Sequence, residues 1–226
     1  MSTPLPHVIE EPRGPAYPKT YGLVARDGTV LVEPTAEEIR YFFEGLSSIK
    51  RGGLWGVIDT EGREVIAPRY TSLDVFSDGL CRAELRGRTL FVDREGKEHP
   101  VPRSKYVDIF SDGLCAVADD KAKWGFVDRT GELVIAHAFD EVGAFSEGLC
   151  AAKTKKGWGF VDKAGKCVIE PRFKRAWGMK NGRAQVVSSG KEPDDAFSAL
   201  LGKQEAGGEF KGLWGVIDRE GRYVVA

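Results

Sequence analysis

Apolar and polar residues alternate along most of this chain in short runs, which is the period of β-strands rather than of helices. The clearest run is Lys155–Phe173, KKGWGFVDKAGKCVIEPRF, in which two alternating segments flank a central turn. The turn carries Asp162 and Gly165, which suit the first position of a type I turn and a position of positive φ. The second segment stops at Pro171, which cannot donate to a β-ladder. The stretch therefore predicts a compact β-hairpin.

Variants of this hairpin recur through the whole chain. They begin at Tyr21, Trp55, Thr89, Trp124, Trp158 and Trp214, and the first five are about 34 residues apart. Each of the first five hairpins is followed by a loop, a turn of the F-S-[DE]-G type and a third strand such as GLCRAEL. The glycine after each hairpin Trp leaves room for another chain segment to approach closely. Constant internal spacing predicts copies of one three-stranded antiparallel meander.

The repeats predict an all-β fold, a tandem array of about six units over residues 21–226. Residues 1–20 are expected to form an extended N-terminal arm. Six hairpins against five third strands favour an open, curved array over a closed, propeller-like ring, because closure would need the arm near Val8 and Ile9 to supply the missing strand. We expect the core to contain strand aliphatics and the hairpin tryptophans Trp55, Trp124, Trp158 and Trp214.

An insertion over about residues 188–212 interrupts the regular spacing in the fifth repeat. Pro193 and the two acidic residues after it resemble a helix start, and Phe197, Leu200 and Leu201 then fall on one helical face. We expect a short amphipathic helix on a long loop. It either packs on the neighbouring sheet or binds a partner, since loops on a rigid scaffold often carry function.

The segment KGWGFVDKAGKCVIEPRF, with FSEGLCAAK before it, resembles the WG (or KWG) repeat found mainly in bacterial proteins. The likeness covers about Tyr21 to Ala226. Departures are Tyr21 for Trp, Thr89-Leu90 for Trp-Gly, and Met179 and Arg183 for Phe and Leu. The resemblance implies an all-β array that mediates interactions, and it supplies no catalytic residue.

Charged residues make up 30% of the chain and nearly cancel, to a net charge of −1. This balance argues against a nucleic-acid partner and against an anionic membrane surface. The N-terminal residues lack the apolar core of a secretory signal, and no run reaches the ~20 apolar residues of a membrane helix. We therefore expect a cytoplasmic protein.

Catalytic and metal-binding patterns are weak. Cys81, Cys115 and Cys150 occupy one repeat position, equivalent to Ser47 and Ala184, which indicates a small packed residue rather than a disulfide or a metal ligand. The histidines do not recur, and no phosphate-binding loop is present. We expect no enzyme activity, no metal and no cofactor. The alternative is an enzyme or small-ligand site in the irregular fifth repeat.

Charge also follows the repeat, because the turns before the hairpins are basic and the F-S-[DE]-G turns are acidic. Stacked units would align them into a basic ridge and an acidic ridge. Such a ridge is either ordinary solvated charge or a surface for a partner of opposite charge. The candidate partner-binding residues are Arg175, Trp177, Met179 and Lys180 of the fifth repeat, Phe197, Leu200 and Leu201 of the insertion, and Arg86, Arg88, Lys121, Lys123, Lys153, Lys155 and Lys156 of the basic turns.

These observations favour a non-catalytic protein–protein interaction module, monomeric when free. The most specific hypothesis is an immunity protein that binds and neutralises a cognate bacterial toxin or effector domain. A general adaptor or scaffold protein is the alternative.

Overall fold

The computed structural model describes residues 6–11, 19–188 and 214–224, and these form strands, turns and irregular segments without a helix. No helix in this described part could therefore cross a membrane. The all-β prediction is confirmed: the strands form antiparallel sheets in tandem, and no described sheet closes into a barrel. The helix predicted over residues 188–212 falls, after Ser188, outside the described residues. The chain divides into two compact parts, Met1–Val101 and Pro102–Ala226.

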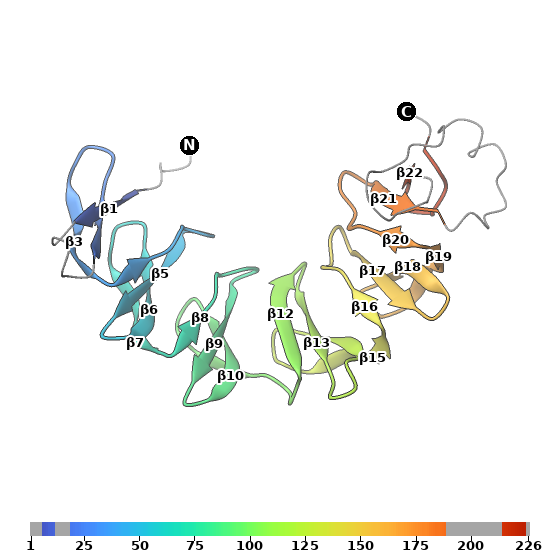
Figure 1. Cartoon of the computed structure of the whole chain (residues 1–226), viewed down its shortest axis with the longest axis horizontal. Helices are drawn as coiled ribbons and strands as arrows, with labels where there is room; N and C mark the ends of the chain where they lie inside the picture. Colours follow the sequence, from blue (N-terminus) through green and yellow to red (C-terminus); the bar gives the residue numbers. More distant parts are fainter. Residues whose placement is uncertain (1–5, 12–18, 189–213, 225–226) are drawn as a thin grey trace. The chain divides into compact units, whose positions relative to one another are not determined.

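Where the N-terminal part is described, its strands form three sheets (Figure 1). The first sheet consists of β1 (His7–Glu11), β2 (Thr20–Val24) and β3 (Val30–Ala36). The second consists of β4 (Glu38–Ile39), β5 (Leu46–Arg51), β6 (Leu54–Asp59) and β7 (Glu64–Tyr70). The third consists of β8 (Ser72–Leu73), β9 (Leu80–Leu85), β10 (Arg88–Asp93) and β11 (Glu98–Pro100).

The described residues of the C-terminal part form three further sheets. The fourth sheet consists of β12 (Tyr106–Ser111), β13 (Leu114–Ala118), β14 (Trp124–Val127) and β15 (Leu133–Phe139). The fifth consists of β16 (Glu141–Val142), β17 (Leu149–Thr154), β18 (Gly157–Asp162) and β19 (Cys167–Phe173). The sixth consists of β20 (Arg175–Ala176), β21 (Ala184–Val187) and β22 (Trp214–Ile217).

The second to sixth sheets each cross the boundary between two sequence repeats. The third strand of one repeat pairs with the hairpin of the next, as β17 pairs with β18 and β18 with β19. A further strand from the loop before the third strand completes the meander, as β16 does on β17. In the described residues this gives four strands to the second, third, fourth and fifth sheets, one more than the predicted three.

The N-terminal arm supplies a strand to the first sheet. β1 pairs with β2 in antiparallel register, with Val8 opposite Leu23. The strand-like patch His7–Ile9 is therefore a strand, and it takes the place that a third strand has in the later sheets.

The hairpin glycine is required because the return strand passes directly over it. A Cβ on Gly159 would lie 2.4 Å from the carbonyl oxygen of Ile169 and 2.8 Å from the nitrogen of Pro171. The strand register shifts between Trp158 and Phe160, so that β19 bulges over the glycine. The chain segment that comes close to this glycine, as the sequence predicts, is therefore the backbone of the return strand.

The turns follow their sequence signatures. Asp59 accepts hydrogen bonds from the amides of Glu61 and Arg63 at 2.9 and 3.0 Å, and Gly62 takes a positive φ of 76°. The F-S-[DE]-G turns have positive φ at both central residues, 54° at Glu147 and 80° at Gly148. This is the two-residue turn that suits the twist of a β-hairpin.

Phenylalanine and branched aliphatic residues form most of the core, and the prediction of a tryptophan core is wrong for most copies. Trp55 is 6% exposed, but Trp124 and Trp158 are only half-buried and Trp214 is 37% exposed. The indole lies near the beginning of its strand, at the periphery of the sheet, whereas Phe160 further along is fully buried. Burial of these apolar side chains on both faces holds neighbouring sheets together.

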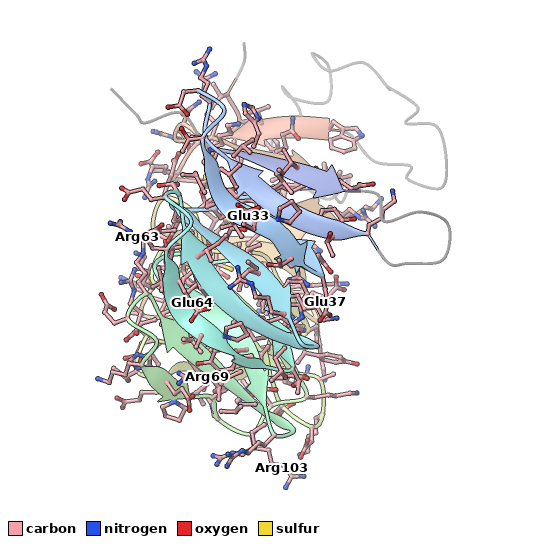
Figure 2. All side chains as sticks on the ribbon, turned by 90° about the vertical axis from the view of Figure 1, so that its left-hand side faces the viewer. Glu33, Glu37, Arg63, Glu64, Arg69 and Arg103 are labelled. Atoms are coloured by element: carbon pink, nitrogen blue, oxygen red, sulfur yellow. The ribbon has the colours of Figure 1, made fainter. Side chains whose placement is uncertain are left out.

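Edge strands carry residues that oppose pairing with another chain. Pro34 lies on β3 and Pro68 on β7, the outer strands of the first two sheets. Charged side chains of the same strands, among them Glu33, Glu64 and Arg69, are labelled in Figure 2. These outer strands are therefore protected against pairing with another chain.

Candidate partner-binding site

The acidic F-S-[DE]-G turns tie neighbouring sheets together. The carboxylate of Glu44 accepts hydrogen bonds from the amides of Asp78 and Gly79 at 2.8 and 2.9 Å. In the C-terminal part, Asp112 accepts from the amide of Gly148 at 2.6 Å. Each acceptor therefore lies in one turn and each donor in the equivalent turn of the following sheet.

A cation from the hairpin turn of the following sheet also contacts each of these carboxylates. Arg94 lies 2.7 Å from the Glu44 carboxylate, and Lys163 lies 2.7 Å from that of Asp112. The hydrogen bond from Lys163 lowers the pKa of Asp112. Partial burial alone would raise the pKa of Glu44, but Arg94 and the two amides outweigh it and hold this pKa below its ordinary value. Glu44, Asp112 and Glu147 of the predicted acidic ridge thus join sheets within one compact part.

Some of the predicted basic residues form ion pairs, and others are exposed to solvent. Lys123 forms an ion pair with Asp140, and Lys153 forms one with Glu141. The exposed members of the set are Arg86, Arg88, Lys121, Lys155 and Lys156. Arg86 and Arg88 lie at the β9–β10 turn of the N-terminal part, and Lys155 and Lys156 lie at the β17–β18 turn.

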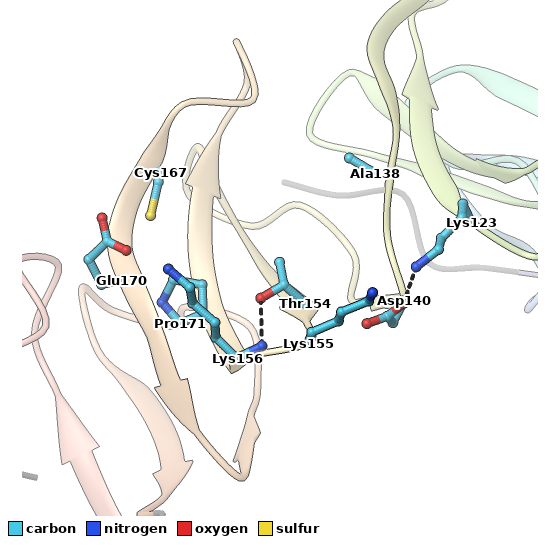
Figure 3. A pocket seen from close by; sticks show the side chains of 9 residues that line it. All are labelled: Lys123, Ala138, Asp140, Thr154, Lys155, Lys156, Cys167, Glu170 and Pro171. Atoms are coloured by element: carbon cyan, nitrogen blue, oxygen red, sulfur yellow. Dashed lines mark hydrogen bonds and ion pairs between the residues drawn. The ribbon is translucent and has the colours of Figure 1, made fainter. Parts of the chain in front are cut away.

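An open groove of about 480 Å³ brings three of the basic residues together (Figure 3). Its lining includes Lys123, Lys155 and Lys156 with Asp140, and Cys167 and Glu170 of β19. The hydrogen bond from Lys123 is the main cause of the lowered pKa of Asp140, and Lys153 and Lys155 contribute through their charge. Sequence reasoning missed Cys167 and Glu170, because they occupy the ordinary return-strand positions of the repeat.

The buried cysteines donate hydrogen bonds to backbone carbonyl oxygens. The thiols of Cys81 and Cys150 donate to the carbonyl oxygens of Asp74 and Gly143 at 3.1 and 3.2 Å. Ser47 makes the same contact through its hydroxyl, to the carbonyl of Arg40 at 2.6 Å. Burial raises the pKa of both thiols to about 12. No group of His, Cys, Asp and Glu among the described residues is placed to hold a metal ion.

The predicted residues of the fifth repeat do not all reach the surface. Met179 is 2% exposed, packed in a core cluster with Phe173 and Ile217, at the position that Phe145 has in the preceding sheet. Its prediction as a contact residue is wrong, because the apolar side chain replaces a core phenylalanine. Arg175, Trp177 and Lys180 are exposed. Phe197, Leu200 and Leu201 lie outside the described residues.

Trp177 and Trp214 form a stacked pair at the surface of the sixth sheet. Their ring centroids are 5.0 Å apart with an interplanar angle of 20°, and the residues are 38% and 37% exposed. In the second sheet, Arg40 lies over the Trp55 ring at 4.0 Å. In the sixth sheet, the ring of Trp177 thus takes the place that the guanidinium of Arg40 has beside the hairpin Trp of the second sheet.

The sequence contained a signal for this pair. The backbone amide of Trp177 donates to Gln185, as that of Arg40 donates to Ser48 and that of Gly143 to Ala151. These residues therefore share one repeat position, and Trp177 is the tryptophan among the three. For Trp214 the regular hairpin pattern predicts a core position instead, so this residue gives no signal of its own.

Among solved structures, this chain is similar to BamB from Moraxella catarrhalis, with 12% identity and a TM-score of 0.38 over 75% of this chain and 61% of that one. It is also similar to the dihydro-heme d1 dehydrogenase NirN, with 14% identity and a TM-score of 0.42 over 91% and 50%. The WD40 domain of SCAP from fission yeast gives 10% identity and a TM-score of 0.35 over 75% and 57%. TM-scores this low do not establish a shared overall fold.

No curated protein matches the chain. The model of the WG containing repeat matches residues 21–55, 55–88, 124–157 and 158–191, which together make up more than half of the chain. The matches follow the hairpin spacing and omit the divergent copy at Thr89 and the last hairpin at Trp214. This protein belongs to the WG-repeat family.

Proposed function

We propose that the protein is a non-catalytic module that binds another protein through the surface around Trp177 and Trp214. The observation that carries the proposal is the stacked pair itself, two indoles that are each more than a third exposed. Exposed tryptophans that can be buried by a partner are the residues in which binding energy is most often concentrated. A β-rich WG-repeat domain suggests the same kind of role.

The pair is held in place before any partner arrives. Trp214 begins β22 and is opposite Val187 of β21, and the amide of Trp177 donates to Gln185 at 3.0 Å. Each indole also restricts the other by stacking. Side chains that are already ordered lose little conformational entropy on docking, which favours tight binding.

The specific form of the proposal is that the partner is a toxin domain and that this protein is its immunity protein. A neutralising protein must stay bound to one partner, and a rigid site with aromatic anchors suits a slowly dissociating one-to-one complex. A general adaptor is the alternative and would bind several partners at the same surface.

The test is an affinity capture from the native cell with the wild type and with Trp177→Gly, which introduces the residue that the fifth sheet carries at this position. Tyr41→Ser is the control, because Tyr41 is an aromatic residue with 86% exposure in the N-terminal part. Wild type and control should recover the same partner, and Trp177→Gly should lose it while melting at nearly the same temperature. Equal recovery by all three proteins contradicts the proposal.

Expression of the recovered partner separates the two forms. A toxin stops growth when expressed alone and permits growth when this protein is expressed beside it. If the partner does not stop growth, the immunity hypothesis is contradicted, whereas the proposal of a protein-binding module still holds.

A further inference from the structure

The outer strand of the fourth sheet lacks the protection that other outer strands have. The sequences of β3 (VLVEPTA), β7 (EVIAPRY) and β19 (CVIEPRF) each contain a proline and at least one charged residue. The sequence of β15 (LVIAHAF) contains no proline and no Asp, Glu, Lys or Arg. Among the described strands β15 pairs with β14 alone, so its other edge is open. An open edge without proline or charge is suited to pairing with another chain.

The side chains that β15 presents to solvent are apolar. Leu133, Val134, Ala136 and Ala138 are all exposed, while Ile135 between them is buried. The register shift beside the hairpin glycine occurs in all four outer strands, so the backbone does not set β15 apart. The difference is a row of apolar side chains along an open edge, and sheets receive an extended segment of another protein at such edges.

The groove of Figure 3 lies where short side chains replace an ion pair between neighbouring sheets. Between the second and third sheets, Arg69 of β7 and Glu98 of β11 form an ion pair at 3.4 Å. Between the fourth and fifth sheets, the same repeat positions are occupied by Ala138 of β15 and Cys167 of β19, and both residues line the groove. The space beside the end of β15 is therefore hollow.

The groove also carries positive charge that the described residues leave available. Lys155 and Lys156 are exposed in the β17–β18 turn, and neither forms an ion pair with another described residue. Asp140 is already paired with Lys123, and Glu170 is the other carboxylate of the lining. Because the three lysines outnumber the two carboxylates, the groove attracts a negatively charged group.

We propose that an extended segment of a partner protein docks along β15, with apolar side chains against Leu133, Val134 and Ala138 and a carboxylate beside Lys155 and Lys156 in the groove. Main-chain hydrogen bonds to the open edge supply affinity, and the lysines select a segment with an acidic end. This surface belongs to the fourth and fifth sheets. It therefore goes beyond the proposed function, which rests on the tryptophan pair of the sixth sheet.

A second copy of this chain is a less suitable occupant of the edge. Antiparallel pairing of two β15 strands about Ala136 would place Glu132 of one copy opposite Asp140 of the other. Like charges that are directly opposite destabilise a pair of strands. A different protein can instead place its own carboxylate at the lysines.

The probe for the test is a fluorescently labelled peptide that alternates Thr and Val and ends in Glu-Glu, compared with the same peptide ending in Gln-Gln. Binding is followed by fluorescence anisotropy. The key variant is His137→Pro/Ala138→Arg, which installs the Pro-Arg pair that β7 and β19 carry at these positions. The control is Thr35→Arg, which adds the same arginine to β3, an outer strand that already contains a proline.

The wild type and the control should bind the Glu-Glu peptide, and the key variant should bind it about tenfold less tightly or worse while melting near the wild-type temperature. A second variant, Lys155→Gln/Lys156→Gln, should weaken binding of the Glu-Glu peptide and leave that of the Gln-Gln peptide unchanged. Trp177→Gly should bind both peptides as the wild type does, so this test and that of the proposed function fail separately.

Three outcomes overturn the proposal. The first is a wild type that does not bind the Glu-Glu peptide, and the second is a key variant that binds it as well as the wild type. The third is a wild type that sediments as a dimer which the key variant loses, because the occupant of β15 would then be a second copy of this chain.

Discussion

The carboxylate of Glu147 accepts a hydrogen bond from the backbone amide of Asn181 at 2.6 Å, in the equivalent turn of the next sheet. A second bond, from Gly182, measures 2.8 Å, and Arg219 lies 3.7 Å away. We expect Glu147→Ala to lower the free energy of unfolding by about 1 kcal/mol, because two backbone donors lose a partner at a partly exposed site. Urea denaturation followed by circular dichroism measures this difference.

Glu95→Ala is the control, since Glu95 is an exposed turn residue at a different position of the repeat. Its effect should stay within about 0.5 kcal/mol. Equal effects of the two substitutions would mean that the turn-to-turn bond does not contribute to stability.

The hydrogen bonds and ion pairs of the acidic turns also predict a loss of stability in acid. Glu44 and Asp112 both have lowered pKa values, from Arg94 and the turn amides for Glu44 and from Lys163 for Asp112. Their charged forms therefore stabilise the fold above the pKa of the unfolded chain, and this contribution is lost as the pH falls through the lower pKa of the folded protein. We expect the free energy of unfolding to fall below about pH 4.

Glu44→Gln should show a shallower decline over that acid range, because it has no charge to lose at this position. Glu95→Gln should follow the wild type. Urea titrations at a series of pH values compare the slopes, and parallel curves for Glu44→Gln and the wild type would contradict the assignment.

A methyl group on the hairpin glycine should be poorly tolerated. Gly159→Ala places its Cβ 2.4 Å from the carbonyl oxygen of Ile169, so the return strand must move. We expect a loss of about 3 kcal/mol or more, or failure to fold. Gly143→Ala is the matched control, because its Cβ would have no neighbour closer than 3.8 Å. Thermal melting that is unchanged in both variants would show that the bulge can relax.

Thiol reactivity should separate the cysteines by burial. Cys81, Cys115 and Cys150 are buried and Cys167 is exposed. Burial is the main cause of the raised pKa of Cys167, and Glu170 adds to it, so its reaction should be slow at neutral pH and faster in mild alkali. Labelling with a maleimide and mass mapping should find Cys167 modified in the native protein. The other three should react after denaturation, and native labelling of Cys81 would contradict the structure.

The sequence determined the hairpins because each turn and each close approach leaves a local residue requirement, such as Gly159 under the bulge. It could not show the two-residue strands β4, β8, β16 and β20, which are too short to display alternation. Local patterns also do not tell which sheets are neighbours, so the sequence predicts a row of acidic turns but not that Glu44 and Glu147 bond to the next turn. The departure of Met179 from the repeat suggests a functional position, whereas its side chain fills a core position.

Within each compact part, the chain passes from one sheet to the next through a single residue, as at Thr71 between β7 and β8 and at Lys174 between β19 and β20. Each third strand is also hydrogen-bonded into the sheet of the following hairpin. Under a pulling force, such a chain has almost no slack between sheets, and one repeat cannot be drawn out without peeling a strand from its neighbour. Within each compact part, the sheets should therefore unfold together under force rather than one after another.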